Sequence, residues 1–350
     1  MLAPVSKYLI QQSSLINEAL QRLNSLDKLI LFVLDENQVL KGTLTDGDIR
    51  RGLMRGLNMD AKVADFMNTK YRAYTVKALT ATLVSELRED NITVVPVLDG
   101  NGKIERLIDF TKTRAILPVT AVIMAGGRGE RLKPLTNSCP KPMLNIGDKP
   151  ILEHVIDRLI DYGVINIYIS VKYLSEQIIK YFGDGANKGI KIQYIHEDDP
   201  LGTFGAVSFL NPSECEHEHL LVMNSDLLTN IDFEDLYIHC LNDDADFTVA
   251  SVPYKVNIPY AILEAENGII KRLSEKPSYT YYANAGIYIF KVSLIERLEK
   301  NAFMNATDFC ESLLNDSRKV TVYPILGYWL DIGKHEDFQK ANEDIKHIKV

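Results

Sequence analysis

The segment from Ala121 to Pro142 constrains this chain most, because it combines a short apolar run, a glycine-rich turn and several cations. It reads AVIMAGGRGERLKPLTNSCPKP. Glycines let phosphate oxygens approach backbone N–H groups, and guanidinium and ammonium groups bring positive charge to the same place. The segment therefore predicts a strand followed by a polyphosphate-binding loop. The residues that carry this chemistry are Gly126, Gly127, Arg128, Gly129, Arg131 and Lys141.

Two commoner phosphate-binding loops do not match this segment. A Walker loop requires Gly-Lys-Ser/Thr after its four-residue spacer, whereas Glu130 and Arg131 follow Gly129 here. A dinucleotide fingerprint requires a third glycine where this chain has Leu132. A turn that merely needs glycines is the remaining alternative, but the arginines and the Pro-Lys-Pro sequence exceed what a turn requires.

Composition limits the classes of protein to consider. A chain of 350 residues with 46% hydrophobic residues exceeds the usual size of one domain and can fill a core. The net charge of −8 and the lack of a basic run argue against nucleic-acid binding. No apolar run approaches the roughly 18 residues of a membrane span, and no secretory signal is recognisable. Four scattered cysteines suit a reducing compartment. We therefore expect a cytoplasmic protein that contacts neither nucleic acid nor membrane.

Apolar periodicity after residue 117 alternates between strand and helix, which predicts an α/β fold. The order favours a doubly wound, mostly parallel, Rossmann-like sheet whose ligands gather at the carboxyl ends of its strands. Both the glycine loop and Asp226 follow such ends. A hairpin and one more strand then predict a mixed extension of the sheet. The expected elements are a helix over 151–160, a strand over 165–171, a helix over 175–181, a strand over 190–195, a helix from Phe204, a strand over 220–223, a hairpin of 261–265 with 269–274, and a strand over 284–290.

The glycine loop GGRGERLKPLT, followed by PKPM, resembles the signature of the sugar-1-phosphate nucleotidyltransferases. Further motifs follow in the order typical of that family, so the resemblance covers about residues 120 to 350. It implies a catalytic domain over residues 117–350. The motifs are EDDPLGTFGA at 197–206, LVMNSD at 221–226, SEKP at 274–277, NAGIYIF at 284–290 and GYWLDIGKHEDF at 327–338.

This resemblance implies that a sugar 1-phosphate attacks the α-phosphorus of a nucleoside triphosphate and releases pyrophosphate. Asp226 and Asp331 would hold Mg²⁺, a cation that prefers carboxylate oxygens. Arg131 would bind the β and γ phosphates and Lys141 the α-phosphate region, so that Arg131, Lys141, Asp226 and Lys276 form the catalytic set. Lys276 would also bind the sugar phosphate, with Glu275 and Asn284 on the sugar. The nucleotide would contact Gly126, Gly127, Arg128, Gly129, Glu130, Glu197, Gly202 and Thr203.

Three positions depart from the family pattern. Glu130 stands where a threonine is common, Ser225 where a glycine is usual, and Ala261 where a glycine often follows the tyrosine.

Glu197 lies where thymidylyl members of the family often have a glutamine that reads the base. An ionised carboxylate accepts hydrogen bonds from guanine N1–H and N2–H₂, whereas thymine and uracil require a donor as well. We therefore expect GTP as the nucleotide.

Residues 1–116 form a separate unit with a weak internal repeat. FVLDEN at 32–37 recurs as PVLDGN at 96–101, and predicted helices over 15–23 and 81–89 precede the two copies. The unit resembles a CBS pair, a tandem module that binds adenosine nucleotides, and Thr45 and Asp48 fit its nucleotide motif. The second copy has Asp109 and Lys112 at the corresponding positions. The unit either binds one purine nucleotide for regulation or serves as a packing module, and CBS pairs commonly dimerise, so we expect a homo-oligomer.

The combination of a CBS pair with this enzyme resembles the guanylyltransferases of bacterial legionaminic acid biosynthesis, which act on glucosamine 1-phosphate. The resemblance implies that substrate and a role in building surface glycans. Two alternatives stay open. One is a thymidylyl- or uridylyltransferase for glucose 1-phosphate. The other is a regulator that binds nucleotide sugars without turnover.

Overall fold

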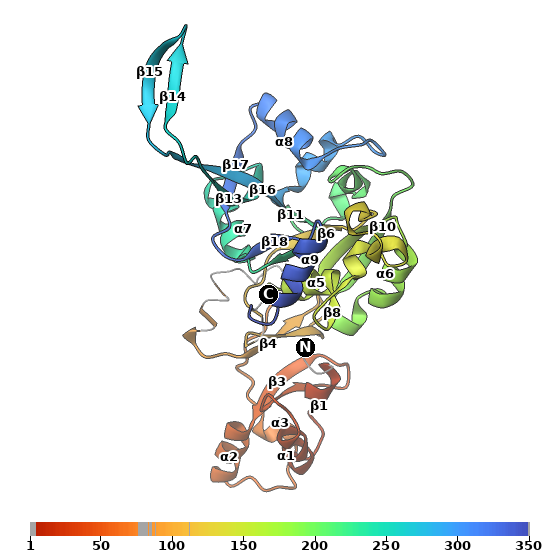
Figure 1. Cartoon of the computed structure of the whole chain (residues 1–350). Helices are drawn as coiled ribbons and strands as arrows, with labels where there is room; N and C mark the ends of the chain where they lie inside the picture. The colour runs from red at the N-terminus through yellow and green to blue at the C-terminus, as the bar shows by residue number, and fades with distance from the viewer. Residues whose placement is uncertain (1–4, 76–82, 84–85, 88, 112, 349–350) are drawn as a thin grey trace. The chain divides into compact units, whose positions relative to one another are not determined.

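The structure is a computed structural model that describes residues 5–75, 83, 86–87, 89–111 and 113–348. The chain divides into two compact units, residues 1–116 and 117–350 (Figure 1). Among the helices of the described residues, none has the length and apolar character needed to cross a lipid bilayer.

The N-terminal unit contains two small sheets that repeat one another. In the first, β1 pairs parallel with β2, and β2 pairs antiparallel with β3. The second sheet is the antiparallel pair of β4 and β5. The elements are β1 (Leu9–Gln11), α1 (Ile16–Asn24), β2 (Ile30–Leu34), β3 (Leu40–Thr45), α2 (Asp46–Met54), α3 (Val63–Phe66), β4 (Val94–Leu98) and β5 (Ile104–Asp109).

The two hairpins correspond residue by residue, each member of the second lying 64 positions after its counterpart. Register shifts follow Val33 in the first hairpin and Val97 in the second. Asp35 and Asp99 occupy equivalent turns, where each carboxylate accepts two backbone N–H bonds. The repeat predicted from the sequence is therefore present as structure. Most of the predicted helix over 81–89, and Lys112, lie outside the described residues.

The C-terminal unit is built on a seven-stranded sheet in the order β10-β9-β6-β11-β16-β13-β17. Every neighbouring pair is parallel except the two that involve β16. The sheet is thus mostly parallel with one reversed strand. Its strands are β6 (Val119–Met124), β9 (Asn166–Val171), β10 (Lys191–His196), β11 (His219–Asn224), β13 (Phe247–Asn257), β16 (Ser278–Lys291) and β17 (Val320–Pro324).

The central strands are covered on both faces. β6 and β11 are buried along nearly their whole length, as expected when helices cover both sides of a parallel sheet. On one face lie the rings of Phe204, Phe247, Phe290 and Phe309, with centroids of stacked pairs 5.0 to 5.3 Å apart. The remaining helices are α5 (Ile151–Asp161), α6 (Ser175–Phe182), α7 (Phe233–Asn242), α8 (Ala306–Asn315) and α9 (His335–Asp344).

Short paired strands complete the unit and bring distant segments together. β12 (Leu227–Thr229) pairs antiparallel with β18 (Trp329–Asp331), and β7 (Asn145–Ile146) with β8 (Lys149–Pro150). Because β12 directly follows the end of β11, the pair with β18 carries residue 331 to the carboxyl edge of the sheet.

The helices and strands predicted between residues 151 and 224 are confirmed to within one or two residues, apart from one helix. The segment from Phe204 is not an α-helix but a 3₁₀ helix, η7 (Gly205–Phe209). The backbone N–H groups of Phe204 and Gly205 both donate to the carbonyl oxygen of Met304. These two bonds to a distant loop hold the backbone at Phe204 and Gly205 in a conformation that is not α-helical.

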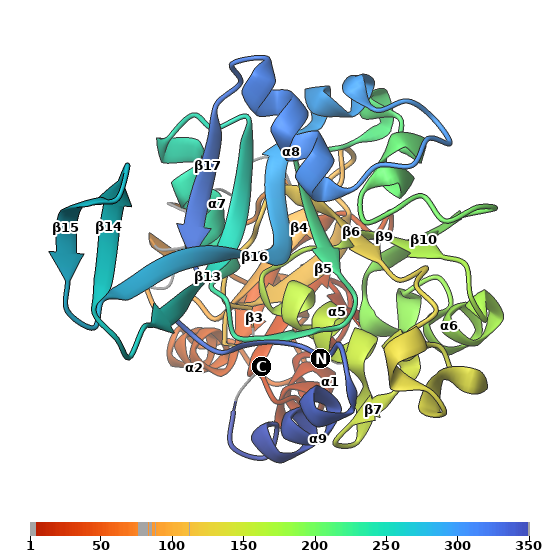
Figure 2. The same cartoon turned by 45° about the horizontal axis from the view of Figure 1, so that its top comes forward.

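The predicted hairpin is confirmed as β14 (Ile262–Glu266) with β15 (Ile269–Ser274). It extends from a two-stranded ribbon made by the outer halves of β13 and β16 (Figures 1 and 2). β16 is exposed from Ser278 to Asn284 and buried from Ala285 to Phe290. The long strand thus belongs to the core at one end and to the exposed ribbon at the other.

Candidate active site

The glycine loop leaves the carboxyl end of β6 and turns back toward Lys141. Gly129 has φ of 64°, and a Cβ added there would lie 2.9 Å from Lys141 Cβ. A residue with a side chain would therefore be strained by its backbone and would displace the lysine. The Thr136 hydroxyl donates to the Gly129 carbonyl oxygen over 2.9 Å, which closes the loop.

Three charged side chains meet beyond the loop. Lys141 is buried and forms an ion pair with Asp226, and its Nζ lies 4.0 Å from Asp331 Oδ1. Asp226 lies in the turn between β11 and β12, whereas Asp331 ends β18. The backbone N–H of Ile332 donates to the Asp226 carbonyl oxygen over 3.1 Å, so the two acidic segments are held side by side.

One ammonium group does not satisfy the two carboxylates. Asp226 Oδ1 and Asp331 Oδ1 are buried and have no hydrogen-bond partner. Burial and the nearby negative charge of Asp226 raise the pKa of Asp331, although Lys141 and Arg131 oppose the shift. Buried carboxylate oxygens that lack a hydrogen-bond partner, on two acidic residues beside the same lysine, fit a hard divalent cation such as Mg²⁺.

The guanidinium group of Arg131 also lies close to Asp331. A Cβ built on Gly333 would lie 3.3 Å from its guanidinium, so this group rests against the chain just after Asp331. Arg128 lies over the ring of Tyr173, 5.8 Å from the centroid. Glu130 is exposed and pairs with Lys133, and that hydrogen bond lowers the pKa of the Glu130 carboxyl.

A cavity of about 450 Å³ lies at this edge of the sheet. It collects residues from the loops that follow β6, β9, β10 and β11, which the parallel arrangement places together. Asp331 is not part of its lining, although Lys141 bridges to it. The predicted site residues that line the cavity are Gly126, Gly127, Arg128, Gly129, Glu130, Arg131, Lys141, Glu197, Gly202, Thr203 and Asp226.

Besides Asp331, three predicted site residues of the C-terminal unit are not part of the cavity lining. Glu275 and Lys276 are exposed at the turn between β15 and β16, where Lys276 has φ of 42°. Asn284 lies in β16 opposite Ser251, and its Oδ1 accepts the Gly286 N–H over 2.9 Å. Since a strand rises about 3.3 Å per residue, Ser278 lies roughly 20 Å along β16 from Asn284. Lys276 therefore lies well out along the ribbon.

Glu197 is buried in the cavity wall, and both of its carboxylate oxygens have partners. The Ser170 hydroxyl donates to Oε1, and the Leu201 backbone N–H donates to Oε2 over 3.2 Å. Two carboxylate oxygens offer about four acceptor sites, so further bonds to a ligand are compatible with these two. The contacts also tie β9 to the loop that contains Gly202.

Lys172 and Phe303 are among the cavity residues that were not predicted as site residues from the sequence. Lys172 directly follows β9, so the rule that ligands gather at the carboxyl ends of parallel strands points to it. Phe303 belongs to the loop before α8, distant in sequence from every motif. No pattern in the sequence indicates that this loop reaches the cavity.

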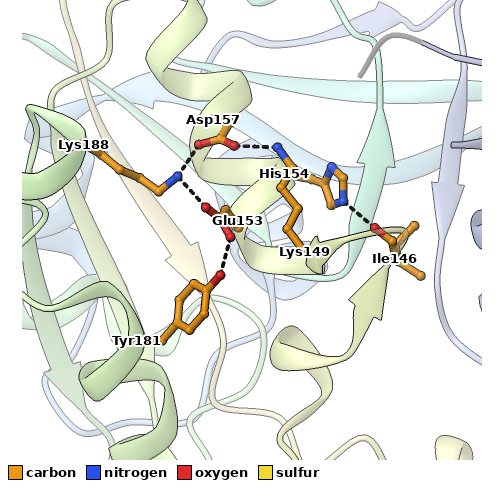
Figure 3. A network of polar contacts seen from close by, with 7 residues as sticks. All are labelled: Ile146, Lys149, Glu153, His154, Asp157, Tyr181 and Lys188. Carbon is orange, nitrogen blue, oxygen red and sulfur yellow. Dashed lines mark hydrogen bonds and ion pairs between the residues drawn. The ribbon is translucent and has the colours of Figure 1, made fainter. Parts of the chain in front are cut away.

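The segment that carries Lys141 is anchored on α5 by the polar network in Figure 3. Burial lowers the pKa of His154, so its neutral imidazole donates to the Ile146 carbonyl oxygen over 2.8 Å. Lys149 pairs with Asp157 over 2.5 Å. Lys188 adds a second pair with Asp157 over 2.7 Å. These contacts fix the chain just after Lys141 to a helix of the core.

In the N-terminal unit, Thr45 and Asp48 are bonded to each other. The Thr45 backbone N–H donates to Asp48 Oδ2 over 2.9 Å, and the Asp48 N–H donates to Thr45 Oγ1 over 3.3 Å. This reciprocal pair is a capping box at the start of α2. Arg51 donates to the other oxygen of Asp48. Strand register places Asp109 of the second copy at the position equivalent to Thr45.

Residues 120–348 match the family model of the nucleotidyl transferases, so the chain belongs to that family. It is 35% identical over 225 residues to the mannose-1-phosphate guanylyltransferase catalytic subunit beta of Drosophila melanogaster, covering 62% of this chain and 60% of that protein. It is 32% identical over 235 residues to the mannose-1-phosphate guanylyltransferase of Mycobacterium tuberculosis, a match that covers 65% of this chain and 64% of that protein. The matches thus span less than two thirds of these relatives' own length.

A solved structure shows a related fold. HddC from Yersinia pseudotuberculosis, complexed with GMP-PN, aligns with a TM-score of 0.51 at 28% identity. The alignment covers 65% of this chain and 99% of HddC. The N-terminal unit lies outside the residues that the family model matches.

We expect Gly202→Ala to destabilise the protein more than Gly189→Ala. Both glycines have a positive φ, 78° and 72°, but a Cβ at residue 202 would lie 2.6 Å from the Met304 carbonyl oxygen, whereas Gly189 faces open space. The backbone strain costs about 1–2 kcal/mol in both variants, and the clash adds about 1–3 kcal/mol in the first. Urea unfolding of the two variants measures the difference, and equal losses of stability would contradict the close contact.

Proposed function

We propose that this chain transfers GMP from GTP to a hexose or hexosamine 1-phosphate and releases pyrophosphate, with Mg²⁺ as cofactor. The observation that carries the proposal is the convergence of Arg131, Lys141 and Asp226 on one cavity beside a glycine loop, with Asp331 joined to them through Lys141. The mannose-1-phosphate guanylyltransferases among its relatives, and the GMP-PN complex of HddC, support guanine as the base.

The reaction forms a bond between a sugar-phosphate oxygen and the α-phosphorus, and it breaks the bond from that phosphorus to the α–β bridging oxygen. Both reactants are anions, so the site must offset their repulsion and stabilise charge on the leaving pyrophosphate. In this proposal Arg131 binds the β and γ phosphates, and the loop N–H groups bind phosphate oxygens. Lys141 stabilises the charge that develops around the α-phosphate.

Asp226 and Asp331 would hold the magnesium ion through their Oδ1 atoms, neither of which has a hydrogen-bond partner. When bound, such an ion neutralises phosphate charge and aligns the reacting oxygens. Lys141 also forms an ion pair with Asp226. We therefore propose that the lysine keeps the acidic pair in place and turns toward phosphate when substrate and cation are bound.

For the sugar phosphate we propose Lys276, with Glu275 and Asn284 near the sugar. The left-handed backbone of Lys276 supports a functional constraint, because strain of about 1–3 kcal/mol at a non-glycine residue is concentrated at functional sites. The role requires the ribbon to approach the cavity when the sugar phosphate binds. Glucosamine 1-phosphate, from the sequence resemblance, and mannose 1-phosphate, from the names of relatives, are the first acceptors to test.

The direct test is a pyrophosphate-release assay with GTP, dTTP and UTP against glucosamine, mannose and glucose 1-phosphates, with and without Mg²⁺. We expect GTP to be preferred and Mg²⁺ to be required. Lys141→Met should lower kcat by about 100- to 1,000-fold, because it removes one charged donor from the transition state. Lys180→Met, an exposed lysine on α6, is the matched control. Absence of pyrophosphate release with every pair would identify a binding protein instead of an enzyme.

The role of Glu197 in choosing guanine predicts a selective loss in Glu197→Gln. The amide presents a donor where guanine also donates, so kcat/KM for GTP should fall by about 10- to 100-fold while UTP and dTTP are less affected. Ser170→Ala, which removes one internal partner but keeps the carboxylate, is the control. If kcat/KM falls equally for all three triphosphates in Glu197→Gln, Glu197 only positions the loop that contains Gly202.

We further propose that the N-terminal unit binds a purine nucleotide near Thr45 and Asp48. The structural repeat supports this, although the two side chains already cap α2 and Asp48 is buried. At least one of AMP, ATP, GMP and GTP should raise the Tm. This rise in Tm on addition of the nucleotide should disappear in Thr45→Val and persist in Lys141→Met. If none of the four changes the Tm or the rate, the unit is a packing module.

A further inference from the structure

The cavity lining contains two chemically different groups of residues. One group is the glycine loop with Arg131, Lys141 and Asp226, which suits phosphates and a cation. The other group is Leu201, Gly202 and Phe303, which belong to the loops after β10 and before α8. A nucleoside triphosphate whose phosphates contact the first group leaves its base to contact the second.

Phe303 is an unusual surface residue. It is 62% exposed, and among the described residues that line the cavity it is the single aromatic side chain. The other exposed phenylalanine of the described chain, Phe209, is 39% exposed and does not line the cavity. Because this largely uncovered ring lines the cavity, it is available to contact a ligand there.

The backbone around Phe303 is held firmly, so the ring is presented from a fixed base. Met304 donates its N–H to the Leu201 carbonyl oxygen over 2.9 Å, and its own carbonyl oxygen accepts from Phe204 and Gly205. The Ala306 N–H donates to Thr203 Oγ1 over 3.0 Å. The loop before α8 and the loop after β10 therefore form one surface.

The two loops pack closely beside the ring. Gly202 carries no side chain, and a Cβ there would lie 2.6 Å from the Met304 carbonyl oxygen. The backbone of residue 202 therefore lies directly against the segment that carries Phe303. A base that enters this part of the cavity would meet the ring of Phe303 and the carboxylate of Glu197, which both line the cavity.

We infer that Phe303 stacks on the base of the nucleotide and contributes to a preference for purines. The inference rests on the proposed function, since it assumes that the cavity binds a nucleoside triphosphate. A purine offers a larger face to the ring than a pyrimidine does. Glu197 then distinguishes bases by their hydrogen-bonding edges, whereas Phe303 distinguishes them by the area that they stack.

The test is the affinity of GTP and UTP, measured by calorimetry with Mg²⁺ and without sugar phosphate, for the wild type and three variants. Phe303→Ala should weaken GTP binding by about 5- to 150-fold, the range that corresponds to stacking on one aromatic side chain. UTP binding should weaken less. Phe303→Tyr, which keeps the ring, should bind as the wild type does. Phe209→Ala, at the other exposed phenylalanine, should also leave both affinities unchanged.

Kinetic measurements separate this role from a structural one. In Phe303→Ala the KM for GTP should rise while the KM for the sugar 1-phosphate and the Tm stay unchanged. GTP binding equal to that of the wild type would refute the stacking role, and an effect on the sugar phosphate alone would assign the ring to the sugar. Equal losses for GTP and UTP would refute the purine preference. If the wild type binds no triphosphate, the proposed function fails together with this inference.

Discussion

The charge cluster of Lys141, Asp226 and Asp331 is the constraint on which the cavity depends. Lys141 is buried, and its ammonium group forms ion pairs with both carboxylates. Acidic groups held together in a partly desolvated place are costly unless cations compensate them. Lys141 and Arg131 oppose the rise in the pKa of Asp331, but burial and the charge of Asp226 outweigh them. In the proposed function, a magnesium ion and the phosphates of the substrate complete this compensation.

The parallel sheet explains how residues so far apart in sequence meet. β6 and β11 are neighbours and run in the same direction, so the glycine loop and Asp226 leave the same edge. β16 runs against them, and its exposed half starts from that edge as the ribbon. Asp331 arrives by a different route, through the pairing of β18 with β12. The sheet thus assembles the cavity, and a short antiparallel pair completes its acidic side.

The sequence predicted what depends on local chemistry or on strand order. The glycine loop, the parallel strands and the hairpin of β14 and β15 were readable because composition and periodicity specify them. Two features were not readable because they depend on contacts between distant segments. The loop before α8 brings Phe303 to the cavity, and its Met304 carbonyl oxygen turns the predicted helix after Phe204 into a 3₁₀ helix. The distance of Lys276 from the cavity likewise follows from the path of the ribbon, which no local pattern encodes.

In the proposed reaction, binding strength and selectivity depend on different residues of the cavity. Phosphates are common to every nucleoside triphosphate, so Arg131 and Lys141 would attract all of them alike. Discrimination would arise where the bases differ, at Glu197 and Phe303. Glu197 is joined to β9 and to the loop of Gly202 by the Ser170 and Leu201 contacts, and Met304 joins that loop to the segment of Phe303. Under this proposal, substitutions of these two residues change the preferred base while the acidic and cationic groups stay in place.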